Sequence, residues 1–132
     1  MAKPRNTAGI PDADILSLTN GTGGAKSAGD FMLLGTVDVG VVVYCATDIA
    51  SAEAGTCYLS GVYASAPKQT GTAWTEGQLL YWDETADDWD PATSATKTAG
   101  AMAVAAAASG DTTGTVRLLG FPESFGHAAA GA

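Results

Sequence analysis

Short hydrophobic stretches alternate with clusters of Gly, Asp, Thr and Ser along most of the chain, and helical periodicity is hard to find. This pattern is typical of short β-strands joined by turns. We expect strands over residues 15–19, 31–35, 36–46, 56–63, 78–84 and 115–121. The polar run 85–88 is expected to reverse the chain after the fifth of these strands and so to form a hairpin with residues 89–97.

The clearest alternation covers residues 36–46. One face of this expected strand carries Val37, Val39, Val41, Val43 and Cys45. The opposite face begins polar at Asp38 and Gly40 and becomes apolar at Val42 and Tyr44. The pattern therefore predicts a strand whose second half is covered on both sides.

Residues 56–63 predict a further strand, with Cys57, Leu59 and Tyr63 on one face. Pairing of this strand with 36–46 would bring Cys45 and Cys57 into the same layer, and cross-strand neighbours can form a disulfide. Thiols of a chain made in the cytosol begin reduced. Two buried free thiols are the preferred expectation, and a disulfide is the alternative.

The alanine-rich stretch 100–108 leaves two structures open. Alanine has the highest intrinsic helix propensity, but a helix of this length is marginal on propensity alone. The stretch also stands between an expected hairpin arm and a tight polar turn that leads into the strand 115–121. We therefore expect a buried strand of small side chains over 100–105, which would allow close approach of another sheet or subunit, with a helix as the alternative.

Length and composition favour one folded unit. The chain has 132 residues, of which 46% are hydrophobic and 15% charged, so it can build a core and is not disordered as a whole. We predict an all-β, compact single-domain fold, either a β-sandwich or a small β-barrel. Residues 1–13 are expected to form a flexible N-terminal arm, 14–121 the β domain and 122–132 a C-terminal tail.

Charge and hydropathy exclude two classes of partner. Fourteen Asp and Glu against six Lys and Arg give a formal charge of −8, which repels phosphate backbones, so no nucleic acid is expected. No stretch is long and apolar enough to cross a membrane, and the start of the chain does not have the pattern of a signal peptide. We expect synthesis in the cytoplasm and no membrane partner.

The residues do not suggest catalysis, a metal or a cofactor. The single histidine, His127, stands in the expected tail, where nothing rigid would hold it beside a nucleophile. Cys45 and Cys57 have no further Cys or His at zinc-ligand spacing. An acidic run could be a calcium loop, but it is not at EF-hand spacing, so a solvated turn is preferred. The run comprises Asp83, Glu84, Asp87, Asp88 and Asp90.

Four aromatic residues gather around the expected hairpin, namely Trp74, Tyr81, Trp82 and Trp89. Side chains of this kind usually pack in a core or across strands, and this is the preferred interpretation. The alternative is an exposed stacking platform for sugars or bases, which would suit a host- or glycan-binding module.

The order of these motifs resembles the phage capsid cement, or head decoration, proteins. The resemblance rests on a glycine-rich loop ending in SAGD, the valine strand, the hairpin YWDETADD and the ending AAASGDTT followed by VRL. In this sequence the last two elements include Tyr81, Trp82 and Asp83, then Ala105 to Asp111, then Val116 to Leu118. The residues around AWTEGQ and TADDWDP, and the tail after Phe121, depart from the family pattern.

The resemblance implies a viral structural protein on the outer surface of a phage head, where it clamps neighbouring major capsid subunits. It also implies a homo-oligomer, with a trimer favoured over a dimer, and no catalytic residues. The expected partner-binding residues lie in the arm and are Lys3, Pro4, Arg5, Ile10 and Pro11. A tail-associated β domain and a host- or glycan-binding module displayed on the particle are the alternatives.

Overall fold

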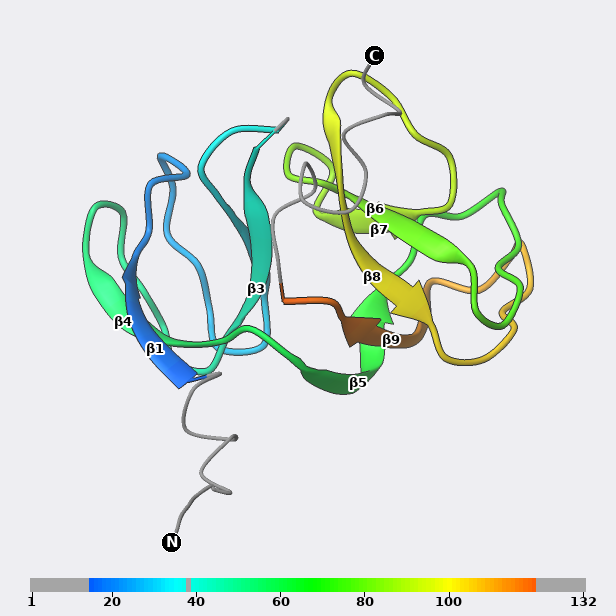
Figure 1. The fold of residues 1–132 in the computed structure, drawn as a ribbon, viewed down its shortest axis with the longest axis horizontal. Coiled ribbons are helices and arrows are strands. Elements are labelled where there is room, and N and C mark those ends of the chain that lie inside the picture. The colour runs from blue at the N-terminus through cyan, green and yellow to red at the C-terminus, as the bar shows by residue number, and fades with distance from the viewer. Residues whose placement is uncertain (1–14, 38, 121–132) are drawn as a thin grey trace, which may run out of the picture.

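The computed structural model describes residues 15–37 and 39–120, and these residues form β-strands and turns (Figure 1). The first four strands are β1 (Ile15–Thr19), β2 (Phe31–Leu34), β3 (Val41–Cys45) and β4 (Ala54–Tyr58). The other five are β5 (Gly61–Pro67), β6 (Leu79–Asp83), β7 (Asp88–Asp90), β8 (Lys97–Ala103) and β9 (Thr113–Leu118). The all-β prediction is confirmed, and within the described part of the chain no helix has the length and apolarity to cross a membrane.

The strands form two antiparallel sheets that lie side by side (Figure 1). One has four strands in the order β1-β4-β3-β2, and the other has five in the order β5-β9-β8-β6-β7. The five-stranded sheet is curled, so that its two terminal strands approach each other. The contact is a parallel bridge between Lys68, just after β5, and Trp89 of β7. The segment between β4 and β5 is where the chain crosses from one sheet to the other (Figure 1).

Two hydrophobic clusters stabilise these sheets. The larger, which we call the inter-sheet core, joins residues of the five-stranded sheet to Phe31 and Val42 of the four-stranded sheet. The smaller, which we call the small core, lies on the other face of β2 and β3 and consists of Met32, Val43, Cys45, Ile49 and Cys57. Alternate residues of β3 therefore enter different cores, which confirms the prediction that this strand is covered on both sides.

The strand predicted over 36–46 is only half correct, because β3 begins at Val41. Residues 35–37, 39 and 40 instead lie in the turn of the β2–β3 hairpin, in which Leu34 pairs with Val41. Gly35 has a φ of +86°, and a Cβ at Gly40 would collide with the carbonyl of Leu34. Only glycine fits this close chain reversal, and it leaves Val39 60% exposed rather than packed on a strand face.

The single strand predicted over 56–63 is wrong, because β4 and β5 belong to different sheets. The chain bends at Gly61, whose φ is +118° and where a Cβ would lie 2.8 Å from the hydroxyl of Tyr63. Cys57 and Leu59 pack in or against the small core, whereas Tyr63 packs against the inter-sheet core. The predicted shared face of these three residues is thus divided between the two cores.

The alanine-rich stretch forms a strand, so the helix alternative is wrong. β8 ends at Ala103, two residues earlier than expected, and pairs with β6 and β9. Ala99, Ala101 and Ala103 are buried. A Cβ at Gly100 would lie 3.0 Å from the Val42 side chain, so small residues here do allow the close approach of the other sheet.

The remaining strand predictions are close to the structure. The β6–β7 hairpin pairs Asp83 with Asp88 around the expected polar turn. β9 begins earlier than predicted and ends at Leu118. Val116 and Leu118 are buried and Arg117 is exposed, as the alternation in this strand predicts.

Candidate functional site

The predicted partner-binding residues lie outside the described residues. They are Lys3, Pro4, Arg5, Ile10 and Pro11. The same is true of His127 and of the predicted C-terminal tail 122–132. The candidate sites below therefore come from the surface formed by the two sheets.

The aromatic residues around the β6–β7 hairpin are core residues. Trp74 and Trp82 are each 2% exposed and Trp89 is fully buried. The rings of Trp82 and Trp89 lie 5.2 Å apart between centroids, and both contact Phe31. The alternative of an exposed stacking platform on these tryptophans is wrong, because none of them presents a ring face to solvent.

The acidic run is not simply a solvated turn. Glu84 and Asp87 form ion pairs with the buried Lys26, at 2.5 and 3.2 Å. Asp90 is 3% exposed and pairs with Lys97. A buried carboxylate needs such a partner to offset its desolvation. Within the described ranges no three His, Cys, Asp or Glu residues are grouped to hold a metal ion.

Glu84 joins the two sheets through one carboxylate. Its Oε1 accepts hydrogen bonds from the Trp82 indole N–H at 2.8 Å and from the backbone N–H of Leu33 at 3.0 Å, while Oε2 pairs with Lys26. Burial lowers the pKa of Lys26, but the hydrogen bond and charge of Glu84, together with Asp87, outweigh burial and raise it. Lys26 is therefore protonated at neutral pH, and it joins the loop before β2 to the β6–β7 hairpin.

The two cysteines are directly opposed on β3 and β4, as predicted from the hairpin. Both are free thiols and both are fully buried. Burial, followed by the neighbouring Cys57, raises the pKa of the Cys45 thiol to about 12. Burial also raises the pKa of Cys57. Because the thiolate is the reactive form, these cysteines are expected to be inert in the folded chain.

The outer edge of the four-stranded sheet is apolar and exposed. β1 pairs with β4 on one side and is the terminal strand of its sheet on the other. Ile15 is 45% exposed and Leu16 is 42% exposed, although they point to opposite faces. The strand sequence contains no charged residue or proline. An edge of this kind favours contact with another protein chain.

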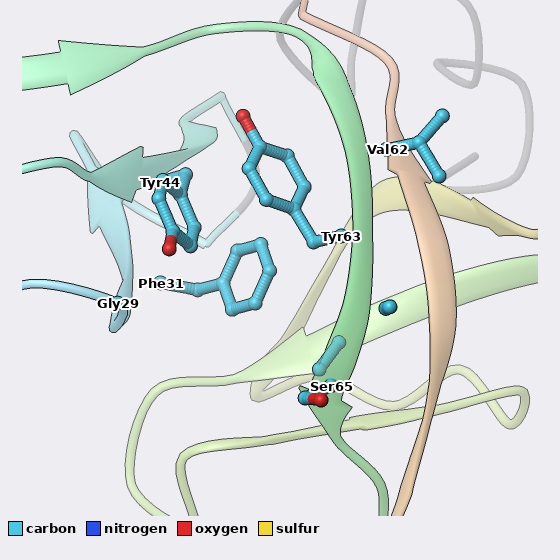
Figure 2. Close-up of a pocket in the computed structure, with 8 residues that line it drawn as sticks. Gly29, Phe31, Tyr44, Val62, Tyr63 and Ser65 are labelled. Atoms are coloured by element: carbon cyan, nitrogen blue, oxygen red, sulfur yellow. The ribbon is translucent and has the colours of Figure 1, made fainter.

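A pocket of about 370 Å³ opens where β5 passes the four-stranded sheet, and we call it the tyrosine groove. Its lining residues are Gly29, Phe31, Tyr44, Val62, Tyr63, Ala64, Ser65 and Ala66. The rings of Tyr44 and Tyr63 are stacked with centroids 4.1 Å apart. Figure 2 shows both tyrosines grouped with Phe31, while Val62 points to the other side of β5.

The tyrosine groove is held rigidly by its neighbours. The Tyr63 hydroxyl donates a 2.6 Å hydrogen bond to the carbonyl of Ser60, and the ring of Tyr58 stacks on Tyr44 at 6.0 Å. Phe31 contacts both groove tyrosines edge-on at 5.5 and 5.6 Å. The groove is lined by half-buried tyrosine rings that pack on one another and by the exposed Ala64 and Ser65 of β5, a surface suited to contact with another protein chain.

Sequence reasoning missed this groove because its three rings come from β2, β3 and β5. The alternation within each strand indicates on which side of that strand a ring lies. It does not indicate which strands become neighbours in the fold. Gly61 two residues before Tyr63 was the one available local signal, since a glycine within an apolar run indicates a bend or a close backbone approach.

Comparison with known proteins yields one match. The family model described as phage cement protein matches residues 10–118, which include all nine strands of the described structure. No curated protein and no solved structure matches the chain in the other two comparisons. Phage cement proteins are structural proteins of the phage capsid. The chain belongs to the phage cement protein family.

Proposed function

We propose that this chain binds the outer surface of an assembled phage head and stabilises contacts between neighbouring major capsid subunits. The family match over residues 10–118 is the observation that carries this proposal. The aromatic residues and the ion pairs of the β6–β7 hairpin support it further. These side chains are buried or paired within the domain, so they stabilise the fold. The exposed features that remain are suited to protein–protein contact.

The proposed contacts fall into two classes. The apolar edge of β1 offers a rigid surface, with Ile15 and Leu16 exposed. The arm 1–13 offers an extended segment, in which Lys3, Pro4, Arg5, Ile10 and Pro11 contact neighbouring subunits. A homo-oligomer, a trimer in preference to a dimer, would present several such contacts to one lattice. Weak contacts made together from one oligomer give slow dissociation.

The proposal is tested on heads assembled without this protein. Adding the purified chain is expected to saturate binding sites on the heads and to raise the temperature at which they rupture. The chain would be made in the host cytoplasm and join the head from outside, so added protein has access to its sites. Heads that neither bind the chain nor gain heat resistance would contradict the proposal.

Deleting residues 1–13 tests the role assigned to the arm. The apparent affinity for heads is expected to fall at least about tenfold, because one of several linked contacts is lost. The melting temperature of the free chain is expected to change by less than about 2 °C, because the deleted residues precede β1. Unchanged binding by the shortened chain would remove the arm from the proposal.

A further inference from the structure

The free edge of β1 presents the backbone groups of alternate residues. In an antiparallel ladder, only every second residue directs its N–H and C=O groups toward a given neighbouring strand. Just after β1, Asn20 donates its backbone N–H to the carbonyl of Glu53, at 2.8 Å. The even-numbered residues of β1 therefore bond to β4, and the odd-numbered residues direct their backbone groups outward. The outward residues are Ile15, Ser17 and Thr19.

The far side of β4 leads to the same assignment. Ala46 donates its backbone N–H to the carbonyl of Thr56, at 2.9 Å, so Thr56 bonds toward β3. Its neighbours Gly55 and Cys57 therefore bond toward β1. The N–H and C=O groups of the three outward residues have no hydrogen-bond partner within the part of the chain that the structure describes. Exposed backbone groups of this kind are a template for pairing with another strand.

The side chains of β1 leave the small core open at this edge. Leu18 packs against the small core, and Leu16 lies on the same face of the strand. Leu16 is registered with the buried Cys57, yet it is 42% exposed, because β1 is the terminal strand of its sheet. A strand that pairs with β1 and carries an apolar side chain on this face would extend the small core.

A second copy of β1 matches this edge when the two strands run antiparallel and are centred on Ser17. Ser17 then lies opposite Ser17 of the second copy and Ile15 lies opposite Thr19, so all the outward N–H and C=O groups are paired. In the same register Leu16 lies opposite Leu18 on the small-core face, at the closely spaced non-hydrogen-bonded positions. We propose that two copies of this chain pair in this register and so join their four-stranded sheets into one continuous sheet.

The charge pattern favours this partner and this direction. β1 contains no charged residue, so two copies of a chain with a net charge of −8 meet there without placing strand carboxylates opposite each other. Asp14 precedes β1 in the sequence. An antiparallel pair keeps the two Asp14 residues at opposite ends, whereas a parallel pair would bring them to the same end. The register centred on Ser17 also repeats every contact twice, as a two-fold interface requires.

This inference rests on the homo-oligomer in the proposed function and names a contact between its copies. A two-fold contact joins copies in pairs, so in a trimeric assembly it would link neighbouring trimers. Ile15 lies on the strand face opposite Leu16, away from the small core. It therefore stays at the surface of the paired sheets, where it remains available to the capsid.

Charge substitutions at Ser17 test the register in sedimentation equilibrium of the full-length chain. The Ser17 side chain is exposed, so the fold accommodates S17K and S17E. Each variant alone is expected to weaken self-association about two- to fivefold, because like charges then face each other across the two-fold axis. An equimolar mixture is expected to regain the native affinity, because each lysine faces a glutamate. S109K and S109E are the controls, since Ser109 is exposed outside the four-stranded sheet and the net charge changes equally.

Proline at the same position tests the backbone pairing. The Ser17 N–H points outward, so S17P removes a donor from the free edge and keeps the hydrogen bonds between β1 and β4. Self-association is expected to fall about tenfold, because both copies lose the donor at the centre of the pair. Thermal unfolding shows whether S17P is folded, and the charge variants decide the matter if it is not. A folded S17P chain that associates like the native chain overturns the inference.

The failure of this inference is distinguishable from failure of the capsid proposal, because these experiments contain no capsid. A native chain whose largest species is a monomer or a trimer would overturn the β1 contact. The same holds for S17K and S17E chains that associate like the Ser109 controls, or for a mixture that associates no better than each variant alone. Heads that still bind the chain would then leave the capsid proposal intact. Conversely, restored association in the mixture supports the β1 contact even if heads do not bind the chain.

Discussion

The two cores of this molecule differ in what fills them and in how they are held. The inter-sheet core contains the three tryptophans and Phe31, and its edge is fixed by the Glu84 carboxylate and its three donors. The small core contains Met32, Val43, Ile49 and the two thiols, without an aromatic ring among its buried members in the described structure. We infer that the inter-sheet core provides most of the stability and sets the geometry of the groove beside it.

The two sheets also differ at their edges. The five-stranded sheet curls until the chain after β5 meets β7, which covers part of both edges. The four-stranded sheet instead ends in β1, where Ile15 and Leu16 remain exposed. Long apolar edges are normally covered or charged in isolated proteins, because they pair with other chains. The exposed apolar edge therefore belongs to the four-stranded sheet, and it is there that we propose a contact with partner chains.

The largest expected effect comes from Phe31, which β2 presents to the inter-sheet core. Its ring lies 5.4–5.6 Å from four other aromatic rings, so Phe31→Ala is expected to destabilise the chain by about 4 kcal/mol. Met32→Ala, the adjacent residue facing the small core, is the matched variant and is expected to cost about 3 kcal/mol. Urea unfolding measures both, and a larger loss for Met32→Ala would reverse the ranking of the two cores.

A smaller difference is expected between two tryptophans of the same core. The Trp82 N–H donates to Glu84, whereas the Trp89 N–H is buried with no hydrogen-bond partner among the described residues. Trp82→Phe removes a donor from a carboxylate that joins the sheets, so it is expected to cost about 1–3 kcal/mol more than Trp89→Phe. Equal losses in thermal or urea unfolding would mean that the Glu84 contact contributes nothing.

The smallest effect is a pH dependence that belongs to the small core. The Cys45 thiol has its pKa raised by burial from 9.0 to about 12, so it keeps its proton in the folded chain while the unfolded chain releases it. The protonated Cys45 thiol therefore contributes fully to the free energy of unfolding below pH 9, and this contribution is lost as the pH rises toward 12. At pH 10 the loss is about 1.4 kcal/mol.

Cys45→Ala is the control for this pH dependence. The raised pKa of Lys26 also reduces stability at high pH, but it does so in both chains and cancels in their difference. The free energy of unfolding of the native chain should therefore fall more steeply between pH 9 and 10 than that of Cys45→Ala. Parallel pH profiles would contradict the burial of this thiol in the small core.

Much of the fold could be predicted from alternation and turn residues, because these act locally. The two-sided burial of Val42 and Val43, the strand over the alanine-rich stretch and the β6–β7 hairpin follow from neighbouring residues. The errors share a different origin. Alternation continues smoothly through Val37 and Val39 and through residues 59–61, where the backbone turns at glycines. A period of two does not reveal where the chain leaves its sheet.

The candidate site was less predictable than the fold. The charged residues of the hairpin were expected to be solvated, but Lys26 and Lys97 pair with them from other strands or loops. The tyrosine groove likewise depends on which strands become neighbours, as do the exposures of Ile15 and Leu16. Contacts between distant parts of the chain determined each of these features, so the sequence pattern within any one segment was insufficient.

We propose that this chain decorates the whole phage head. Quantitative mass spectrometry of purified particles tests it most directly, by comparing copies of this chain with copies of the major capsid protein. We predict a ratio near one or a simple fraction such as one-third, as expected for occupancy of every equivalent lattice position. A handful of copies per particle would instead assign the chain to a tail or vertex, and its absence from particles would contradict the account.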